Sequence, residues 1–238
     1  MGLKQDLESA VSSTLTTTWN TRQGTIVPKT AGVALSGGAV KLQATILYAD
    51  LADSTELAMA HDRRVGAKVY KSFLLCASKI IRSHAGHIRS FDGDRVMGVF
   101  VGATKNTAAA KCALQINWAF LNIVRPQIEA KYPGLKARNW SFAHCVGVDT
   151  SDVLVVRSGI RDNNDLVWVG RAPNVAAKLS AIRAGKYHSY ITKAVYNSLA
   201  DEVKYTAREK AKIWEACKWS KVAGVEDIFR SSWTYPLT

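Results

Sequence analysis

The sequence predicts an α+β domain in which helices pack on a sheet with an antiparallel centre. Short apolar runs that end at acidic residues are typical of buried strands. Longer segments carry apolar residues every three or four positions, which is typical of helices. Between them, RSFDGDRVMGVF at 89–100 contains Asp92-Gly93, a strong signal for a two-residue β-hairpin turn. We therefore expect one sheet built around this hairpin.

The first half of the chain is predicted to begin with an extension and to continue with a strand and helices. Residues 1–43 are weakly periodic, and we expect them to form an N-terminal extension with one short helix at 3–15. The apolar run ATILYADL at 44–51 has the pattern of a buried strand. Residues 54–86 are helical, and we expect two helices, because Asp62 is a suitable N-terminal cap for the second.

The second half alternates strands with helices. A hairpin is predicted at 87–100 and a long helix at 104–130. The remaining elements are strand-like segments at 140–148 and 153–156, which we expect to pair, a strand at 166–169, a helix at 173–182, and short strands near 189–192, 212–217 and 226–235. From residue 44 the core order is β-αα-β-β-α-β, which resembles the split βαβ, ferredoxin-like arrangement with helices on one face of the sheet.

The composition fits one domain plus an extension. The chain has 238 residues, of which 47% are hydrophobic and 21% charged, so it can bury a sizeable core. It contains no run of about 18 apolar residues, so we expect no transmembrane helix and no membrane partner. The start lacks the apolar segment of a signal peptide, and the four cysteines lack metal-ligand spacing. We therefore expect a cytoplasmic protein with reduced thiols.

The net charge of +13, from 32 basic and 19 acidic residues, is the strongest signal in the composition. Such an excess suits either nucleic acid or a small polyanion, such as a nucleoside triphosphate, that is steered into a basic cleft. No RNP, zinc-finger or helix-turn-helix pattern accompanies the basic residues. We therefore do not expect nucleic acid to be the main partner. The densest basic group comprises Lys204, Arg208, Lys210, Lys212, Lys218 and Lys221.

Two acidic residues are candidates for a metal site. Asp50 ends the first predicted strand, and Asp94 follows the predicted hairpin turn. In a ferredoxin-like sheet these strands are neighbours and both acids lie at the same end, where their charges repel unless a cation lies between them. Carboxylate oxygens favour Mg²⁺ or Mn²⁺. The alternative is that Asp94 is a solvated turn residue and Asp50 a helix cap, and the spacing alone leaves both interpretations open.

Three motifs in this order resemble those of the class III nucleotidyl cyclases. They are ILYADLADST at 46–55, GHIRSFDGDRVMGVF at 86–100 and VGRAPNVAAKLS at 169–180. The resemblance covers roughly residues 44–235, and it implies that 44–238 form a class III catalytic domain with a βααββαβ core. It also implies a metal-dependent reaction in which the 3′-hydroxyl of a nucleoside triphosphate attacks its own α-phosphate and pyrophosphate leaves.

The resemblance implies roles for five residues. Asp50 and Asp94, with the backbone carbonyl of Leu51, would hold two Mn²⁺ or Mg²⁺ ions per site. Asn174 would orient the ribose, and Lys178 would stabilise charge on the α-phosphate. The family places the metal ligands and the asparagine on different subunits. A homodimer with two sites at its interface is therefore expected.

The sequence departs from the family at two points. Lys178 stands where the family has an arginine, and Arg171 or Lys221 could assist it. The polar pair that reads a purine base is replaced by Ser90 and Val167, which would leave the ring groups of adenine or guanine unpaired. We therefore expect Ser90, Val167 and Arg171 to contact a substrate other than a purine nucleotide.

This combination is similar to the pyrimidine cyclases of the Pycsar antiphage systems, as is the stretch TWNTRQGTIVPKT at 18–30. The resemblance implies a uridylate cyclase that converts UTP to 3′,5′-cyclic UMP and pyrophosphate, a second messenger that acts on a separate effector during phage infection. Three alternatives stay open. They are a cytidylate cyclase that converts CTP to cyclic CMP, an adenylyl cyclase with an atypical base pocket, and a catalytically silent nucleotide- or nucleic-acid-binding module.

Overall fold

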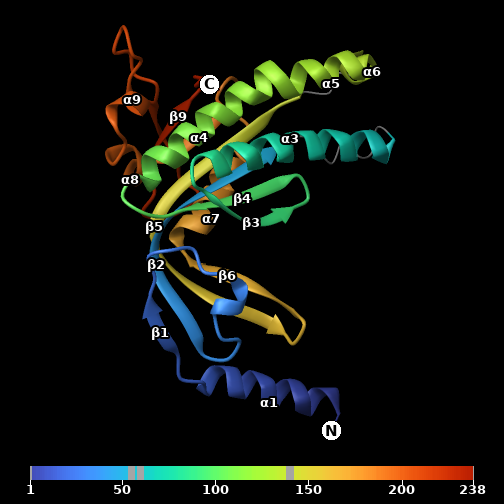
Figure 1. The fold of residues 1–238 in the computed structure, drawn as a ribbon, viewed down its shortest axis with the longest axis vertical. Helices are drawn as coiled ribbons and strands as arrows, with labels where there is room; N and C mark the ends of the chain where they lie inside the picture. Colours follow the sequence, from blue (N-terminus) through green and yellow to red (C-terminus); the bar gives the residue numbers. More distant parts are fainter. Residues whose placement is uncertain (1, 53–56, 58–61, 138–141, 238) are drawn as a thin grey trace.

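A computed structural model describes residues 2–52, 57, 62–137 and 142–237 of the chain (Figure 1). Its strands are β1 (Asn20–Gln23), β2 (Gly38–Leu51), β3 (His87–Asp92), β4 (Arg95–Phe100), β5 (His144–Ile160), β6 (Asn163–Gly170), β7 (Ser189–Thr192), β8 (Glu215–Lys218) and β9 (Asp227–Ser231). Its main helices are α1 (Leu3–Thr16), α3 (Arg63–Ser83), α4 (Lys105–Ala119), α5 (Arg125–Lys131), α6 (Pro133–Ala137), α7 (Arg171–Ser180), α8 (Lys193–Asn197) and α9 (Asp201–Lys204). The first of the two helices predicted over 54–86 falls largely outside the described residues.

The strands form one mixed sheet in the order β3-β4-β2-β5-β7-β9-β8, with β1 paired to β2 and β6 paired to β5. The strand β2 lies antiparallel to both β4 and β5. The four-strand order β3-β4-β2-β5 is that of a ferredoxin-like sheet, and the predicted α+β class is confirmed. The parallel pairing of β5 with β7 adds a crossover through α7.

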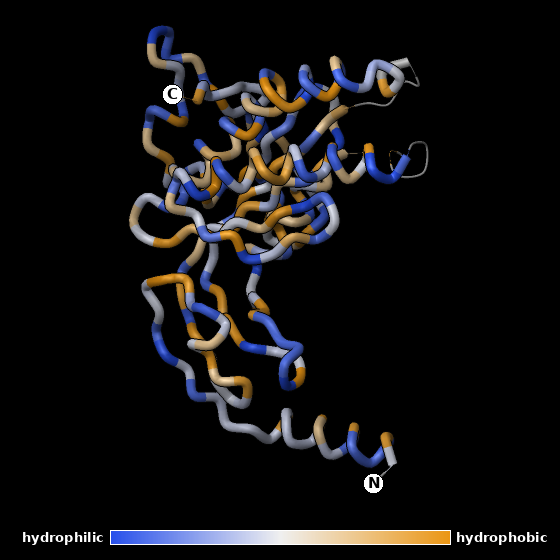
Figure 2. The backbone as a smooth tube through the Cα atoms, turned by 45° about the vertical axis from the view of Figure 1, so that its right-hand side comes forward, coloured by the Kyte–Doolittle hydropathy of each residue, from blue (hydrophilic) through white to orange (hydrophobic). Residues whose placement is uncertain are grey.

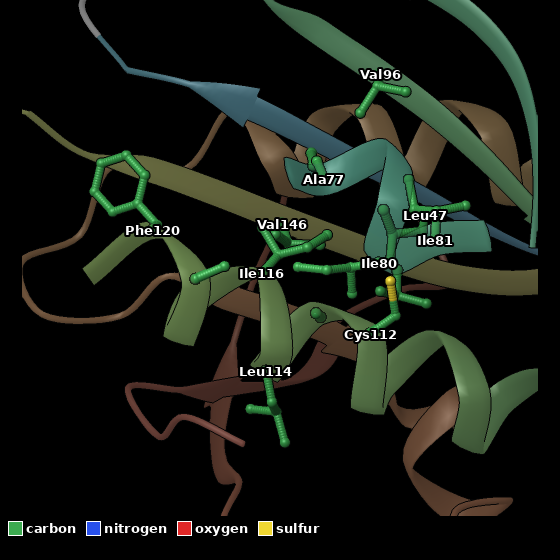
Figure 3. Close-up of a cluster of buried hydrophobic side chains, with 14 of the residues drawn as sticks. Leu47, Ala77, Ile80, Ile81, Val96, Cys112, Leu114, Ile116, Phe120 and Val146 are labelled. Carbon is green, nitrogen blue, oxygen red and sulfur yellow. The ribbon is translucent and has the colours of Figure 1, made fainter. Parts of the chain in front are cut away.

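Helices cover both faces of the sheet, so the expectation of a single covered face is wrong. The strand β2 is apolar on both faces, as a strand buried on both sides must be. Leu47 faces a cluster with residues of α3 and α4 (Figure 3). The next residue toward the N-terminus, Ile46, faces the opposite cluster with Ala172 and Ala176 of α7.

The helix α7 packs directly on β5, because Gly147 has no side chain. A Cβ atom at Gly147 would lie 2.2 Å from the carbonyl oxygen of Ala176 and 2.5 Å from the amide nitrogen of Ser180. Both atoms belong to the backbone of α7, so a larger residue would push the helix away. The glycine therefore fixes the height of α7 above the sheet, and with it the positions of Asn174 and Lys178.

The strands β2 and β5 are longer than the sequence indicates. The strand β2 begins at Gly38, inside the expected extension, and β1 pairs with it there. The expectation that 140–148 and 153–156 form a pair is wrong, because β5 is one continuous strand that lies along β2 from Leu51↔His144 to Ala39↔Val156. The far half of β5 forms its hairpin with β6. The domain boundary at 43/44 stays a prediction, although β2 crosses it.

The far halves of β2 and β5, with β1 and β6, project from the body of the protein as an arm that ends at α1 (Figures 1 and 2). Val27 and Val33, from the expected extension, are buried against this arm. The helix predicted at 3–15 corresponds to α1, and the helix predicted at 104–130 corresponds to α4 and α5 joined by a π-helical turn. Among the described residues, no helix has the length and apolar character that crossing a bilayer requires.

Candidate active site

The two predicted metal carboxylates lie together at one end of the sheet. Asp50 pairs with Arg95 across β2 and β4, and Asp94 directly precedes Arg95. The pKa of Asp50 is raised, first by burial and then by the negative charge of Asp94. The Oδ2 atom of Asp94 is buried without a hydrogen-bond partner. The fold therefore brings two partly buried acids close together, as the motif spacing predicts.

The hairpin that carries Asp94 turns one residue later than expected. Asp92 pairs with Arg95, so the two turn residues are Gly93 and Asp94 instead of Asp92 and Gly93. Gly93 has φ of 60°, which suits the first turn position of a type II′ hairpin. Asp92 is the exposed end of β3 and forms an ion pair with Arg95 at 2.7 Å. The two acids thus differ in environment, and Asp94 is the one beside Asp50.

These groups fit a divalent cation. A buried carboxylate oxygen without a partner, beside a second carboxylate, offers hard anionic ligands whose repulsion a cation relieves. Leu51 follows Asp50 at the end of β2, where its carbonyl could add a ligand. In the described part of the chain, no group of three or more His, Cys, Asp or Glu side chains gathers as a metal site. Two carboxylates suffice for Mg²⁺, which keeps waters and binds substrate phosphates.

A cation that the sequence does not indicate lies beside these acids. The Nη2 atom of Arg183 donates a hydrogen bond to Oδ2 of Asp50 over 3.1 Å. Its Nη1 atom donates to the carbonyl oxygens of Ser180, at 2.7 Å, and Ile182, at 3.1 Å. Arg183 is 133 residues from Asp50 in the sequence, and only the packing of α7 on β5 brings the two together. No local pattern could have identified it.

A second group of predicted residues lines a cavity of about 320 Å³ between β3, β4, β6 and α7. Ser90 and Val167, the predicted base-reading positions, both line it, and so does Asn174. Tyr48, Arg89, Asp165 and Trp168 are among the other lining residues. The structure therefore joins three residues that the sequence places far apart.

Arg89 and Trp168, which both line this cavity, carry hydrogen-bond donors without a partner. The register of β3 against β4 shifts between Ile88 and Ser90, which places Arg89 in a bulge next to Ser90. The Arg89 side chain is only 17% exposed and lies 3.5 Å from Asp165. The Nε atom of Arg89 and the Nε1 atom of Trp168 are both buried without a partner. Strict strand alternation would put Arg89 and Ser90 on opposite faces, so the sequence alone does not reveal this pair.

The carboxylates and the cavity remain separate within one chain. Neither Asp50 nor Asp94 lines the cavity that contains Asn174. Asn174 and Lys178 are exposed on α7, and the amide of Asn174 donates to the carbonyl oxygen of Gly170 over 3.2 Å. One described chain therefore presents two partial sites: the carboxylate pair with Arg183, and the cavity with Asn174.

Arg171 has a different partner from the one expected. Its guanidinium donates to both carboxylate oxygens of Asp149, at 3.0 and 3.1 Å, and to the carbonyl oxygen of Thr150 at 2.8 Å. Asp149 is fully buried and also accepts a hydrogen bond from Thr192. Burial raises the pKa of Asp149, and these partners oppose that shift. Within one chain Arg171 therefore anchors α7 to β5 and does not line the cavity, and its contact with substrate stays a prediction.

Sequence comparison finds relatives along the full length of the chain. A "Uridylate cyclase" of Rhodovulum sp. (strain MB263) is 44% identical over 237 residues, which are 99% of each chain. Others from Burkholderia cepacia (43% identical, 100% of this chain and 98% of that) and Xanthomonas perforans (38% identical, 100% of both) carry the same name. No protein-family model matches the chain.

Solved structures share the fold at low sequence identity. A guanylyl cyclase is 18% identical and superposes with a TM-score of 0.66 over 82% of this chain and 94% of its own. An adenylyl cyclase from P. aeruginosa, also 18% identical, has a TM-score of 0.64 over 81% of this chain and 95% of its own. These neighbours establish the nucleotidyl cyclase fold.

The anchoring role of Arg171 predicts a pH-dependent loss of stability. Arg171→Gln should lower the free energy of unfolding by about 2 kcal/mol or more at pH 8, because Asp149 keeps a buried charge with fewer partners. Burial already raises the pKa of Asp149, and the substitution removes a cause that lowers it, so the folded variant binds this proton at a higher pH than the folded wild-type protein. The loss is therefore present above the folded-state pKa and should shrink as the pH falls toward 4, because a protonated Asp149 carries no charge for Arg171 to pair with.

Urea unfolding at both pH values measures this loss. Arg161→Gln is the matched control, because Arg161 is exposed beside the β5–β6 turn and its charge faces solvent. An equal loss at pH 8 and near pH 4, or none at either, would contradict the anchoring role.

Proposed function

Because the chain belongs to the family of these uridylate cyclases, we propose that it converts UTP to 3′,5′-cyclic UMP and pyrophosphate. The observation that carries the proposal is 38–44% identity over the full length of three relatives of that name. The fold is that of the nucleotidyl cyclases. The chain is therefore a nucleotidyl cyclase, and the proposal concerns its substrate, its ions and its assembly.

In the proposed reaction, the 3′-oxygen of UTP forms a bond to the α-phosphorus and the bond to the bridging oxygen of pyrophosphate breaks. The proton of the 3′-hydroxyl is released to water. Asp50, Asp94 and the carbonyl of Leu51 would hold two Mg²⁺ or Mn²⁺ ions, which when bound lower the pKa of that hydroxyl and neutralise the triphosphate. Asn174 orients the ribose for in-line attack. Lys178 stabilises charge on the α-phosphate as a point charge.

The donors in the cavity support UTP over CTP. Uracil presents carbonyl oxygens at positions 2 and 4, and both accept hydrogen bonds. Arg89 and Trp168 each have a buried N–H without a partner, and Ser90 adds a hydroxyl. Cytosine has an amino group at position 4, which would face one of these donors. The amino group and that donor would both lack an acceptor, and a buried site discriminates against such a base.

The separation of the two partial sites supports a homodimer. A twofold axis would bring the carboxylate pair of one chain to the Asn174 cavity of its partner, and it would do so twice. This arrangement makes two equivalent sites from the two half-sites of each chain. The antiphage role, the separate effector of cyclic UMP and the cytoplasmic location stay predictions from the resemblance.

The first test uses the purified full chain with Mn²⁺ and each of ATP, GTP, CTP and UTP. We expect cyclic UMP as the main product, resolved by liquid chromatography and mass spectrometry. Asp94→Ala should abolish turnover, because the carboxylate pair loses a ligand. Asp92→Ala is the matched control: it removes an exposed acid two residues away that pairs with Arg95, and it should retain most activity.

The outcomes of this test separate the alternatives. Cyclic CMP as the main product would favour the cytidylate cyclase, and cyclic AMP alone would contradict a pyrimidine substrate. A folded wild-type protein that turns over none of the four nucleotides would support the silent binding module. Activity that persists in Asp94→Ala would refute the assignment of the metal ligands.

A mixing experiment tests the shared site. Asp94→Ala and Asn174→Ala should each be nearly inactive alone. Co-expressed chains that pair at random should recover about a quarter of the wild-type rate, because half the dimers are mixed and each mixed dimer has one intact site of two. Different affinity tags on the two chains, used in two successive purifications, verify that mixed dimers form. Mixed dimers without recovered activity would show that each site lies within one chain.

The hydrogen-bond donor of Trp168 should contribute to the choice of base. Trp168→Phe keeps an aromatic ring but removes the Nε1 donor, so kcat/KM for UTP should fall about fivefold to tenfold, with a smaller change for CTP. Trp19→Phe is the control, because Trp19 is exposed in the N-terminal arm. Equal losses for UTP and CTP would indicate a packing role for Trp168 and no reading of position 4.

A further inference from the structure

We propose that Arg183 is a further phosphate-binding residue of the active site. Its guanidinium pairs with Asp50 while the site is free of nucleotide, and it binds the triphosphate when nucleotide and cations arrive. The proposal rests on the proposed function, because it assigns Arg183 a role toward UTP. Neither the motifs nor the comparisons give Arg183 a role.

The backbone holds the guanidinium in place from one side. Its Nη1 atom donates to the carbonyl oxygens of Ser180, the last residue of α7, at 2.7 Å, and of Ile182 at 3.1 Å. Cations are favoured at this end of a helix, where carbonyl groups lack intrahelical partners. The Nη2 atom is left facing Asp50. The backbone therefore holds the Nη1 side of the guanidinium, and the Nη2 side faces Asp50.

Exposure places this ion pair where a substrate can reach it. The Arg183 side chain is 36% exposed and Asp50 is 16% exposed, so Arg183 is the outer member of the pair. A pair at such a boundary contributes little to stability, because water screens it. Removal of Arg183 should therefore leave the fold intact.

The local charges indicate when Arg183 becomes available. Asp50 and Asp94 form an anionic pair, and Arg183 and Arg95 are the cations that lower the pKa of Asp50. Arg95 is already bound to Asp92 at 2.7 Å and lies over the ring of Tyr48 at 5.3 Å. Within the described residues, Asp50 is the only acid that pairs with Arg183. Once cations satisfy the carboxylates, the Nη2 atom of Arg183 is free beside them, while Nη1 stays bound to the backbone.

Phosphate is the ligand that suits the guanidinium of Arg183. A planar guanidinium binds two oxygens of one phosphate, which an ammonium cannot do. The site otherwise relies on Lys178, a point charge, where related cyclases carry an arginine. Arg183 would thus supply a guanidinium contact through its Nη2 side, which Lys178 lacks, on the chain that also supplies Asp50 and Asp94. It would contact the phosphates of the leaving pyrophosphate beside the metal ligands.

The role predicts opposite effects on cation binding and on nucleotide binding. Arg183→Gln removes a cation that competes for Asp50, so Mn²⁺ alone should bind several-fold more tightly, measured by the loss of the free Mn²⁺ signal in electron paramagnetic resonance. The same substitution removes a phosphate contact, so KM for UTP should rise about tenfold with little change in kcat. Arg183→Lys should restore part of the UTP affinity.

Two comparisons make the result decisive. Lys186→Gln removes one positive charge three residues further along the chain and should change neither quantity, and urea unfolding checks that each variant is folded. Weaker binding of both Mn²⁺ and UTP in Arg183→Gln would mean that Arg183 merely holds Asp50 in position and would overturn the proposal. Unchanged values of both would overturn it as well.

The test distinguishes the failure of this proposal from the failure of the proposed function. Wild-type protein without uridylate cyclase activity would refute the function, while the Mn²⁺ measurement, which needs no turnover, would still judge the pairing of Arg183 with Asp50. Wild-type protein that makes cyclic UMP, with an unchanged KM in Arg183→Gln, would refute Arg183 alone.

Discussion

The close packing of α7 on β5 is the constraint on which the rest of the structure depends. Gly147 allows the helix backbone to contact the strand, and the bonds from Arg171 to the buried Asp149 fix the start of the helix. These two contacts determine where Asn174 and Lys178 stand above the sheet. They also determine where the chain leaves the helix, and so bring Arg183 to Asp50. One packing interaction thus supplies residues to both partial sites.

The electrostatics of the carboxylate end follow from the same arrangement. Two partly buried acids at the ends of adjacent strands would destabilise the fold if both were charged without a counterion. Arg183 and Arg95 reduce this cost in the free chain, as the causes that lower the pKa of Asp50 indicate. The overall charge of +13 suits an anionic substrate at this end, since a positive field steers triphosphates toward the site. The carboxylate end of the sheet can therefore be stable without cations or nucleotide and still attract an anionic substrate.

The sequence predicts the parts of the site that depend on neighbouring strands and fails where distant segments meet. Asp50 and Asp94 could be placed together because one ends a strand and the other lies in the turn before its neighbour. The turn lies one residue later than the Asp-Gly signal predicts, because Gly93 occupies the first turn position, as in a type II′ hairpin. Arg89 depends on a bulge and Arg183 on helix packing, and neither feature leaves a periodic signal.

A continuous strand and a shared hydrophobic cluster join the N-terminal segment to the rest of the protein. The strand β2 runs without interruption from Gly38 to Asp50 and Leu51, so the arm and the carboxylate end share one strand. Val27 and Val33 are buried in the cluster that also contains Ala172 and Ala176 of α7. A disturbance in the arm would therefore act on β2 and on the support of α7 together, and those two elements carry Asp50 and Asn174. The strand β2 is longer than the apolar run at 44–51 predicts. Because of this length, one strand extends from the arm to Asp50.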